Sequence, residues 1–192
     1  MQRYMKQLIQ FIFLLLLLCS ISSILVGCRK TYDENTSAIF ELKCSVISND
    51  SLLPVEYTCD GLSETLPLEW SVYPTNTRYF ALIMYTVASP TDIHWYWVLY
   101  NIPVSVNSLA KNTFGTGTLG NNSLNGMAAY APPCSQGTGF KKYILTIYAL
   151  TDSVTTTVPK PEVSMNVLVD AIKNITLAEA SLTVKYSRII DW

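Results

Sequence analysis

Short apolar segments, separated by stretches rich in Gly, Pro, Asn, Ser and Thr, follow one another along the chain from residue 40 onward. Residues 40–46 alternate between apolar and polar positions, which is typical of a strand with one buried face. Residues 79–85 and 96–102 are apolar on both faces, as expected of central strands that are covered on each side. The predicted strands are residues 40–46, 69–72, 79–85, 96–102, 142–150 and 181–186.

One helix and one long connection complete the pattern. Residues 164–174 place apolar side chains on one helical face, and Ser164 can cap this helix. Residues 105–139 predict a long loop, in which Gly115, Gly117 and Gly120 formally match a dinucleotide-binding motif. That motif needs a strand before it and a helix after it, and no helical pattern follows here. Many strands with few helices indicate a mainly β fold, a β-sandwich with a few peripheral helices.

The first 28 residues have the layout of an export signal. Two basic residues precede a long apolar run, which ends in Leu25-Val26-Gly27-Cys28. This ending resembles a lipobox, in which the Cys thiol receives lipid before cleavage. We therefore expect residues 1–27 to be a signal peptide, 28–37 a lipidated tether and 38–192 one domain. The alternative is an uncleaved membrane anchor, because residues 8–26 could nearly span a bilayer.

Charge and chemistry exclude several functions. The whole chain carries 13 basic and 14 acidic residues, and both basic residues of the signal lie before the first acidic one. The exported part is therefore slightly acidic, which argues against nucleic-acid binding. Of the five cysteines, Cys19 lies in the predicted signal peptide and Cys28 is predicted to carry lipid. The other three and the single histidine, His94, give no zinc spacing, and no nucleophile-elbow motif is present. We expect no enzymatic activity, no metal and no cofactor.

Several motifs in a fixed order carry a family resemblance. Between residues 40 and 188 the chain resembles the phosphatidylethanolamine-binding protein (PEBP) family, in its bacterial Raf-kinase-inhibitor-like branch (YbhB/YbcL-type). The resemblance implies a PEBP-like sandwich of antiparallel sheets with a shallow anion pocket at one end. The motifs are Tyr57-Thr58-Cys59-Asp60-Gly61, Pro67-Leu68-Glu69-Trp70, Phe80-Ala81-Leu82-Ile83-Met84, Trp97-Val98-Leu99-Tyr100-Asn101-Ile102-Pro103, Pro133-Cys134, Gly137-Thr138-Gly139, Tyr143 and Tyr148-Ala149-Leu150.

The implied pocket departs from the family pattern at three positions. Ala88 stands where relatives have a pocket carboxylate, Tyr96 replaces one histidine and Lys141 replaces another. Alternation places Lys141 and Tyr143 on one strand face, which leaves a pocket with one ammonium and two phenols. His94 lies two positions before the family's histidine and is more simply interpreted as a turn residue at a strand entry. Alternatively, Lys141 turns into solvent and the tyrosine rings close the pocket.

The same resemblance implies a disulfide between Cys59 and Cys134, because the two loops lie toward one end of the family fold. Cys44 is then the free thiol. From the residues alone, the three exported cysteines that carry no lipid, Cys44, Cys59 and Cys134, allow any one bridge and one leftover.

These observations predict a lipid-anchored, non-catalytic binder of a small anionic or phospholipid-headgroup-like ligand, with Ala88, His94, Tyr96, Lys141 and Tyr143 as candidate site residues. The expected location is the bacterial cell envelope, at the outer membrane facing the periplasm or the surface. The alternative function is a protein-interaction or inhibitor module, similar to kinase- or protease-regulating relatives, with an envelope protein as partner.

Overall fold

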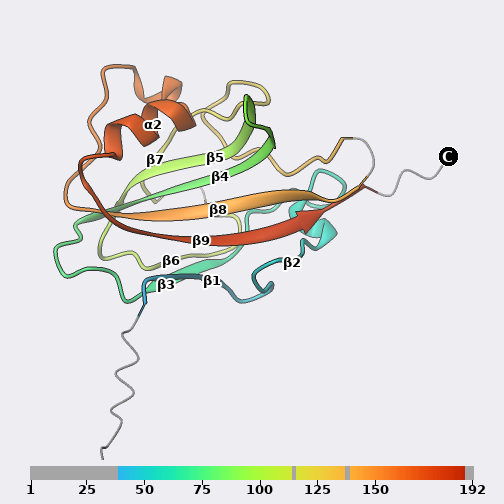
Figure 1. Cartoon of the computed structure of the whole chain (residues 1–192), viewed down its shortest axis with the longest axis horizontal. Coiled ribbons are helices and arrows are strands. Elements are labelled where there is room, and N and C mark those ends of the chain that lie inside the picture. Colours follow the sequence, from blue (N-terminus) through green and yellow to red (C-terminus); the bar gives the residue numbers. More distant parts are fainter. Residues whose placement is uncertain (1–38, 114–115, 137–138, 189–192) are drawn as a thin grey trace, which may run out of the picture. The chain divides into compact units, whose positions relative to one another are not determined.

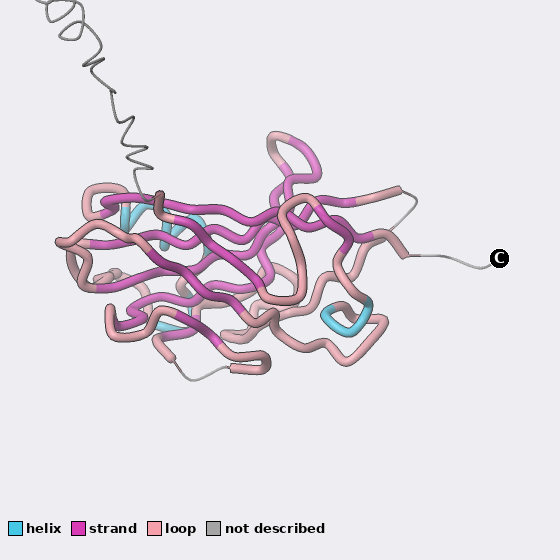
Figure 2. The backbone as a smooth tube through the Cα atoms, turned by 90° about the horizontal axis from the view of Figure 1, so that it is seen from below, coloured by secondary structure: helices cyan, strands magenta, loops and turns pink. Residues whose placement is uncertain are grey.

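The structure is a computed structural model that describes residues 39–113, 116–136 and 139–188. The predicted signal peptide (1–27), the tether (28–37) and its Cys28 lie outside these residues. The described part is a mainly β domain with two sheets, which confirms the predicted fold class (Figure 1). Strands run side by side through the domain, and the helical segments lie at its edges (Figure 2). In this part of the chain, no helix is long and apolar enough to cross a membrane.

The larger sheet has six strands in the order β2-β9-β8-β4-β5-β7. Its centre is formed by the apolar segments that the sequence predicts as strands covered on both faces. The hairpin of β4 and β5 extends beyond the neighbouring strands. The strands are β2 (Ser51–Leu52), β4 (Tyr79–Ser89), β5 (Asp92–Pro103), β7 (Thr118–Leu119), β8 (Lys141–Leu150) and β9 (Thr176–Tyr186).

A smaller sheet packs against one face of the larger one. It consists of β1 (Glu41–Cys44), β3 (Leu68–Ser71) and β6 (Ser108–Leu109), in the order β1-β3-β6. Alternate side chains of both sheets meet in a buried core, which includes Trp70 from the small sheet and Phe80 and Trp97 from the large one. This interior layer, which we call the inner core, fixes which face of each strand points between the sheets.

The opposite face of the large sheet forms a second core. Helix α2 (Met165–Ile172) covers it, with Leu168 packing among residues such as Ile83 and Val98. Ser164 caps the helix, because its side-chain oxygen accepts a hydrogen bond from the Val167 amide at 3.3 Å. Two short 3₁₀ turns, η1 (Val55–Tyr57) and η2 (Lys160–Glu162), complete the helical content of the described chain.

The structure differs from the sequence prediction mainly at connections. Strand β2 is not among the predicted strands, and it pairs with β9 in parallel, so the large sheet is mixed rather than purely antiparallel. Strand β9 begins at Thr176, five residues before the predicted start. The long predicted loop contains two-residue strands, β6 and β7. Gly120 follows β7 without a helix, and a Cβ there would meet the Val163 carbonyl oxygen at 2.2 Å, so this glycine serves close packing.

Candidate functional site

The register of β8 brings two predicted site residues to one end of the large sheet. Lys141 opens the strand and lies opposite Tyr186 of β9, and Tyr143 lies opposite Val184. Tyr143 belongs to the inner core and is fully buried. Because side chains alternate along a strand, Lys141 shares this inner face, whereas Lys142 is exposed on the other face.

Tyr96 reaches the same place through a β-bulge. Along the β4–β5 pair, Met84 lies opposite Trp97 and Tyr85 lies opposite Trp95, so Tyr96 is the extra residue of β5. Tyr96 and Trp97 therefore both join the inner core although they are consecutive. The rings of Tyr96 and Tyr143 meet edge to face, with centroids 5.2 Å apart. We call Tyr96, Lys141 and Tyr143 the tyrosine–lysine site.

Two hydroxyls at this site are buried without a hydrogen-bond partner in the described part of the chain. They are Tyr143 Oη and Ser135 Oγ, and both residues are at most 1% exposed; the Tyr143 hydroxyl lies near the hydroxyls of Ser135 and Tyr96, but in no pair does the geometry complete a hydrogen bond. Burial raises the pKa of the Tyr143 phenol, and the nearby Tyr96 raises it further. The phenol is therefore protonated at neutral pH and available as a donor. A buried donor without an acceptor costs free energy, so its presence here needs a reason.

The two remaining candidates of the sequence prediction, Ala88 and His94, lie toward the tip of the β4–β5 hairpin. Ala88 is exposed and sits in an irregular part of the pairing. Thr86, two residues earlier, is buried and donates its hydroxyl to the Lys142 carbonyl at 2.6 Å. His94 lies within β5 opposite Thr86, rather than at a turn, and its Nε2 contacts the Asp92 carboxylate at 3.0 Å. Thr86, and not Ala88, is thus the buried residue of this strand beside the tyrosine–lysine site.

A carboxylate does lie at this end of the sheet, but it comes from another loop. Asp60 accepts a 2.6 Å hydrogen bond from the Tyr186 hydroxyl and pairs with Arg188. The hydrogen bond from Tyr186, together with Arg188, lowers the pKa of Asp60. These contacts therefore stabilise the fold at neutral pH, and the stabilisation is lost as acid protonates Asp60 below its ordinary pKa. Because Arg188 neutralises Asp60, this carboxylate does not cancel the positive charge of Lys141.

A disulfide fixes the loop that carries Asp60. Cys59 is bonded to Cys134, with Cα atoms 5.2 Å apart, and the Cys59 amide donates to the Pro133 carbonyl at 3.0 Å. This is the pair that the family resemblance implies, and of the cysteines with described positions Cys44 is the free one. The bridge also holds Ser135, the next residue along, beside the tyrosine–lysine site.

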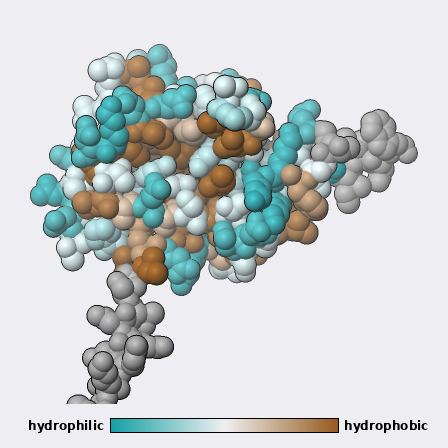
Figure 3. All heavy atoms as spheres, viewed as in Figure 1, coloured by the Kyte–Doolittle hydropathy of each residue, from teal (hydrophilic) through white to brown (hydrophobic). Residues whose placement is uncertain are grey.

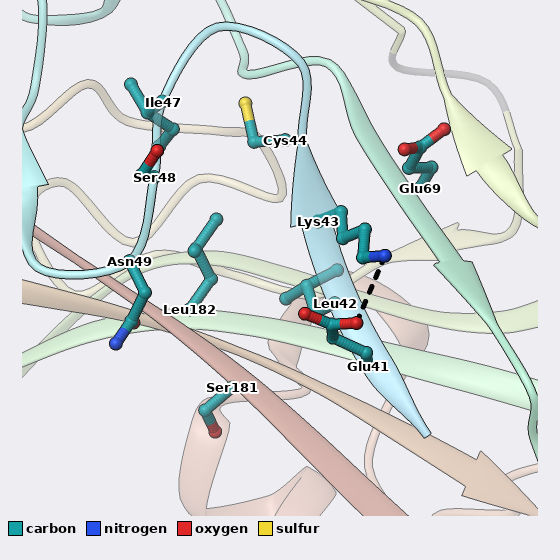
Figure 4. Close-up of a pocket in the computed structure, with 10 residues that line it drawn as sticks. All are labelled: Glu41, Leu42, Lys43, Cys44, Ile47, Ser48, Asn49, Glu69, Ser181 and Leu182. Atoms are coloured by element: carbon teal, nitrogen blue, oxygen red, sulfur yellow. Dashed lines mark ion pairs between the residues drawn. The ribbon is translucent and has the colours of Figure 1, made fainter. Parts of the chain in front are cut away.

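A separate hollow of about 490 Å³ lies between β1 and β9 and includes Cys44 (Figure 4). Lys43 points toward Glu41, at 3.1 Å, whereas the Cys44 sulfur points away from this ion pair. With Glu69 also present, the hollow is net acidic and does not suit an anion. Burial raises the pKa of the Cys44 thiol, which disfavours the reactive thiolate. Among the residues with described positions, no cluster of His, Cys, Asp or Glu is arranged to hold a metal ion.

The sequence prediction did not include Ser135, Thr86 or Asp60 in the site. Ser135 directly follows the Pro133-Cys134 motif, and Asp60 directly follows Cys59. Their positions beside these motif cysteines were the sequence feature that could have identified them as site residues. Nothing in the sequence favoured Thr86 over Ala88 as a site residue, because alternation places both on one face of the strand. They differ in that Ala88 lies nearer the exposed tip of the β4–β5 hairpin.

Comparisons with known proteins agree with this architecture. The family model described as phosphatidylethanolamine-binding protein matches residues 43–187. A UPF0098 protein of Methanothermobacter thermautotrophicus is 30% identical over 152 residues, which cover 77% of this chain and 98% of the relative. A UPF0098 protein of Chlamydia muridarum is 29% identical over 154 residues, covering 77% and 99%.

Two solved structures have the same fold. A crystal structure of a putative PEBP homologue from Chlamydia trachomatis gives a TM-score of 0.71 at 24% identity and covers 78% of this chain and 98% of its own. The structure of Escherichia coli YbcL, described as a member of the mammalian PEBP family, gives a TM-score of 0.69 at 23% identity and covers 79% and 100%. The likeness to these structures is one of fold.

Proposed function

Because the chain belongs to the phosphatidylethanolamine-binding protein family, we propose that it is a non-catalytic, membrane-anchored binder of a small anionic or phospholipid-headgroup-like ligand. The observation that carries this proposal is the tyrosine–lysine site. An ammonium group, Lys141, begins the strand that also carries Tyr143, whose buried hydroxyl has no protein partner among the described residues. An anion is the ligand that satisfies both groups.

Each residue has a definite part in this proposal. Lys141 supplies positive charge, while Tyr143 and Ser135 supply neutral hydroxyl donors in surroundings of low polarity, where such hydrogen bonds are strong. Tyr96 meets Tyr143 edge to face and both rings are buried, so we expect the Tyr96 ring to shift when the ligand enters. Thr86 holds the β4 and β8 backbones together beneath the ligand.

The predicted lipid anchor would hold the tyrosine–lysine site close to a membrane. If Cys28 carries two or three acyl chains, the domain is held permanently at a membrane, because each buried methylene contributes roughly 0.8 kcal/mol and one chain alone holds only marginally. Phospholipid headgroups and free phosphate metabolites share a phosphate group, which is the chemistry that Lys141 and the hydroxyls recognise.

The test is a titration of residues 38–192, followed by NMR. This segment contains both hydrophobic cores and the disulfide, so it can be produced without the leading residues. We expect phosphate and phosphoethanolamine to shift the resonances of Tyr96, Lys141 and Tyr143 saturably at millimolar concentration. Lys141→Ala should weaken the affinity about tenfold, because a hydrogen bond to a charged group contributes about 1.5–3 kcal/mol.

Lys142→Ala is the matched control, since this neighbouring lysine lies on the opposite face of the same strand. It removes the same charge from the protein but leaves the tyrosine–lysine site intact. Equal loss of affinity in both variants would indicate unspecific attraction to positive charge. Absence of any saturable shift would reject ligand binding and leave the alternative, an interaction module for an envelope protein.

A further inference from the structure

The outer face of the large sheet, opposite the inner core, is only partly covered. Helix α2 and its neighbours pack on Ile83 and Val98, but the β4–β5 hairpin continues beyond them. Past this point the same face carries apolar side chains with Val87 50% exposed, and Phe140, just before β8, is 64% exposed. We call these residues the hairpin patch: Tyr85, Val87, Ile93, Trp95, Phe140 and Ile144.

Five of the six patch residues are neighbours across β4, β5 and β8, whereas Phe140 precedes β8 and is separated from Ile144 by Lys142 on the same face. Val87 lies directly opposite Ile93, and Tyr85 lies opposite Trp95 on one side and Ile144 on the other. The second core fixes the positions of three patch side chains, because it packs against Tyr85, Ile93 and Trp95. In the surface view, apolar residues lie among polar ones over the larger sheet (Figure 3). Clustered exposed apolar groups of this kind mark interaction sites.

Basic side chains border the hairpin patch. Lys142 is exposed on the same face and lies directly opposite Lys185 of β9. Like charges in this position repel each other. Asp50 pairs with Lys185 at 2.6 Å, and Lys142 also helps to lower the pKa of this carboxylate, so two lysines share one acid here. Asp92, at the hairpin tip, contacts His94 Nε2 at 3.0 Å, a contact that balances its charge only when the imidazole is protonated.

We propose that the hairpin patch docks the domain onto the surface of an anionic phospholipid bilayer. Apolar and aromatic side chains beside lysine match the boundary between lipid headgroups and acyl chains. The segment that separates Cys28 from the first described residue, Ile39, spans at most about 40 Å, so an anchored domain stays within reach of its bilayer. Tethering raises the local concentration of lipid to about the millimolar range, so a patch of about millimolar affinity, which the untethered domain still shows at that lipid concentration, is sufficient.

This proposal rests on the proposed membrane anchoring, but it concerns a different surface from the tyrosine–lysine site. Lys142 lies on the face of β8 opposite to Lys141 and Tyr143, and Phe140 directly precedes this strand. The bilayer would therefore contact the outer face of the sheet while the site faces the inner core.

The test measures co-sedimentation of residues 38–192 with vesicles of phosphatidylcholine and phosphatidylglycerol at millimolar lipid. The double variant Val87→Ser, Phe140→Ser should bind at least about tenfold more weakly, because it loses most of the buried apolar surface. Val169→Ser, an exposed valine on α2, is the matched control and should bind as the unaltered domain does. Lys142→Ala should lower binding about fivefold on these vesicles and not on pure phosphatidylcholine.

The outcomes separate the two proposals. Loss of vesicle binding in the double variant, with phosphoethanolamine shifts retained, supports the hairpin patch and shows that the variant is folded. Vesicle binding that Lys141→Ala abolishes and the double variant leaves intact overturns the patch, because the bilayer is then held through a headgroup at the tyrosine–lysine site. No vesicle binding by the unaltered domain also overturns it, whatever the soluble ligands do.

Discussion

The hydroxyl of Tyr143 affects stability and binding in opposite directions. It is buried without a partner among the described residues, so its removal spares the fold an unsatisfied donor. We predict that Tyr143→Phe leaves the free energy of unfolding unchanged or raises it by roughly 1 kcal/mol. The same change should weaken phosphate binding about tenfold, since it removes a donor to the anion. Denaturant unfolding and NMR titration of one preparation measure both effects.

Two other tyrosines provide the controls. Tyr130 donates its hydroxyl to the Tyr57 carbonyl at 3.3 Å, so Tyr130→Phe should lower stability by about 1 kcal/mol. Tyr100, on the other face of the sheet, has a buried hydroxyl for which the described residues offer no partner, and Tyr100→Phe should alter neither stability nor ligand affinity to any large extent. A large destabilisation by Tyr143→Phe would show that its hydroxyl supports the fold rather than a ligand.

At the residue scale, the shared strand face of Lys141 and Tyr143 could be predicted from the sequence, whereas the residues that surround them could not. Strict alternation along β8 was sufficient to put both on one face. Tyr96 reaches that face only because of a bulge, and alternation alone would place it opposite to its core neighbour Trp97. The family resemblance supplied this position because it compares residues by motif and not by periodicity.

At the scale of elements, the long connections are held by the Cys59–Cys134 bridge. It closes a loop with a sequence separation of 75 residues and contains much of the inner core between its ends. In the chain-entropy account, a bridge of this span contributes about 4 kcal/mol. The double variant Cys59→Ser, Cys134→Ser should therefore unfold at clearly lower denaturant concentration. Cys44→Ser, which removes the free thiol, should have a much smaller effect, and equal effects would contradict this role of the bridge.

The elements with strong periodicity were predicted well, and those defined by tertiary pairing were not. The central strands and helix α2 follow from apolar spacing within each segment. Strands β2, β6 and β7 are two residues long and exist only because a partner strand lies beside them. The early part of β9 alternates small and polar residues, a weak local signal that pairing with β8 overrides.

For the whole molecule, the fold followed from the family resemblance, and the proposed membrane location rests on the predicted lipobox. We predict that Cys28→Ala abolishes incorporation of radiolabelled palmitate when the full chain is expressed in a Gram-negative host, and that it releases the protein from the membrane fraction. Labelling that persists in the variant would contradict lipidation at this residue. Loss of label with retained membrane association would indicate an uncleaved anchor formed by the apolar N-terminal run.

The most direct test of the central claim is a crystal structure of residues 38–192 grown with phosphoethanolamine. We expect the phosphate group within hydrogen-bond distance of Lys141 Nζ and Tyr143 Oη, with the Tyr96 ring displaced from its present edge-to-face contact. A phosphate bound elsewhere, with Lys141 turned to solvent and the two tyrosine rings unmoved, would contradict it.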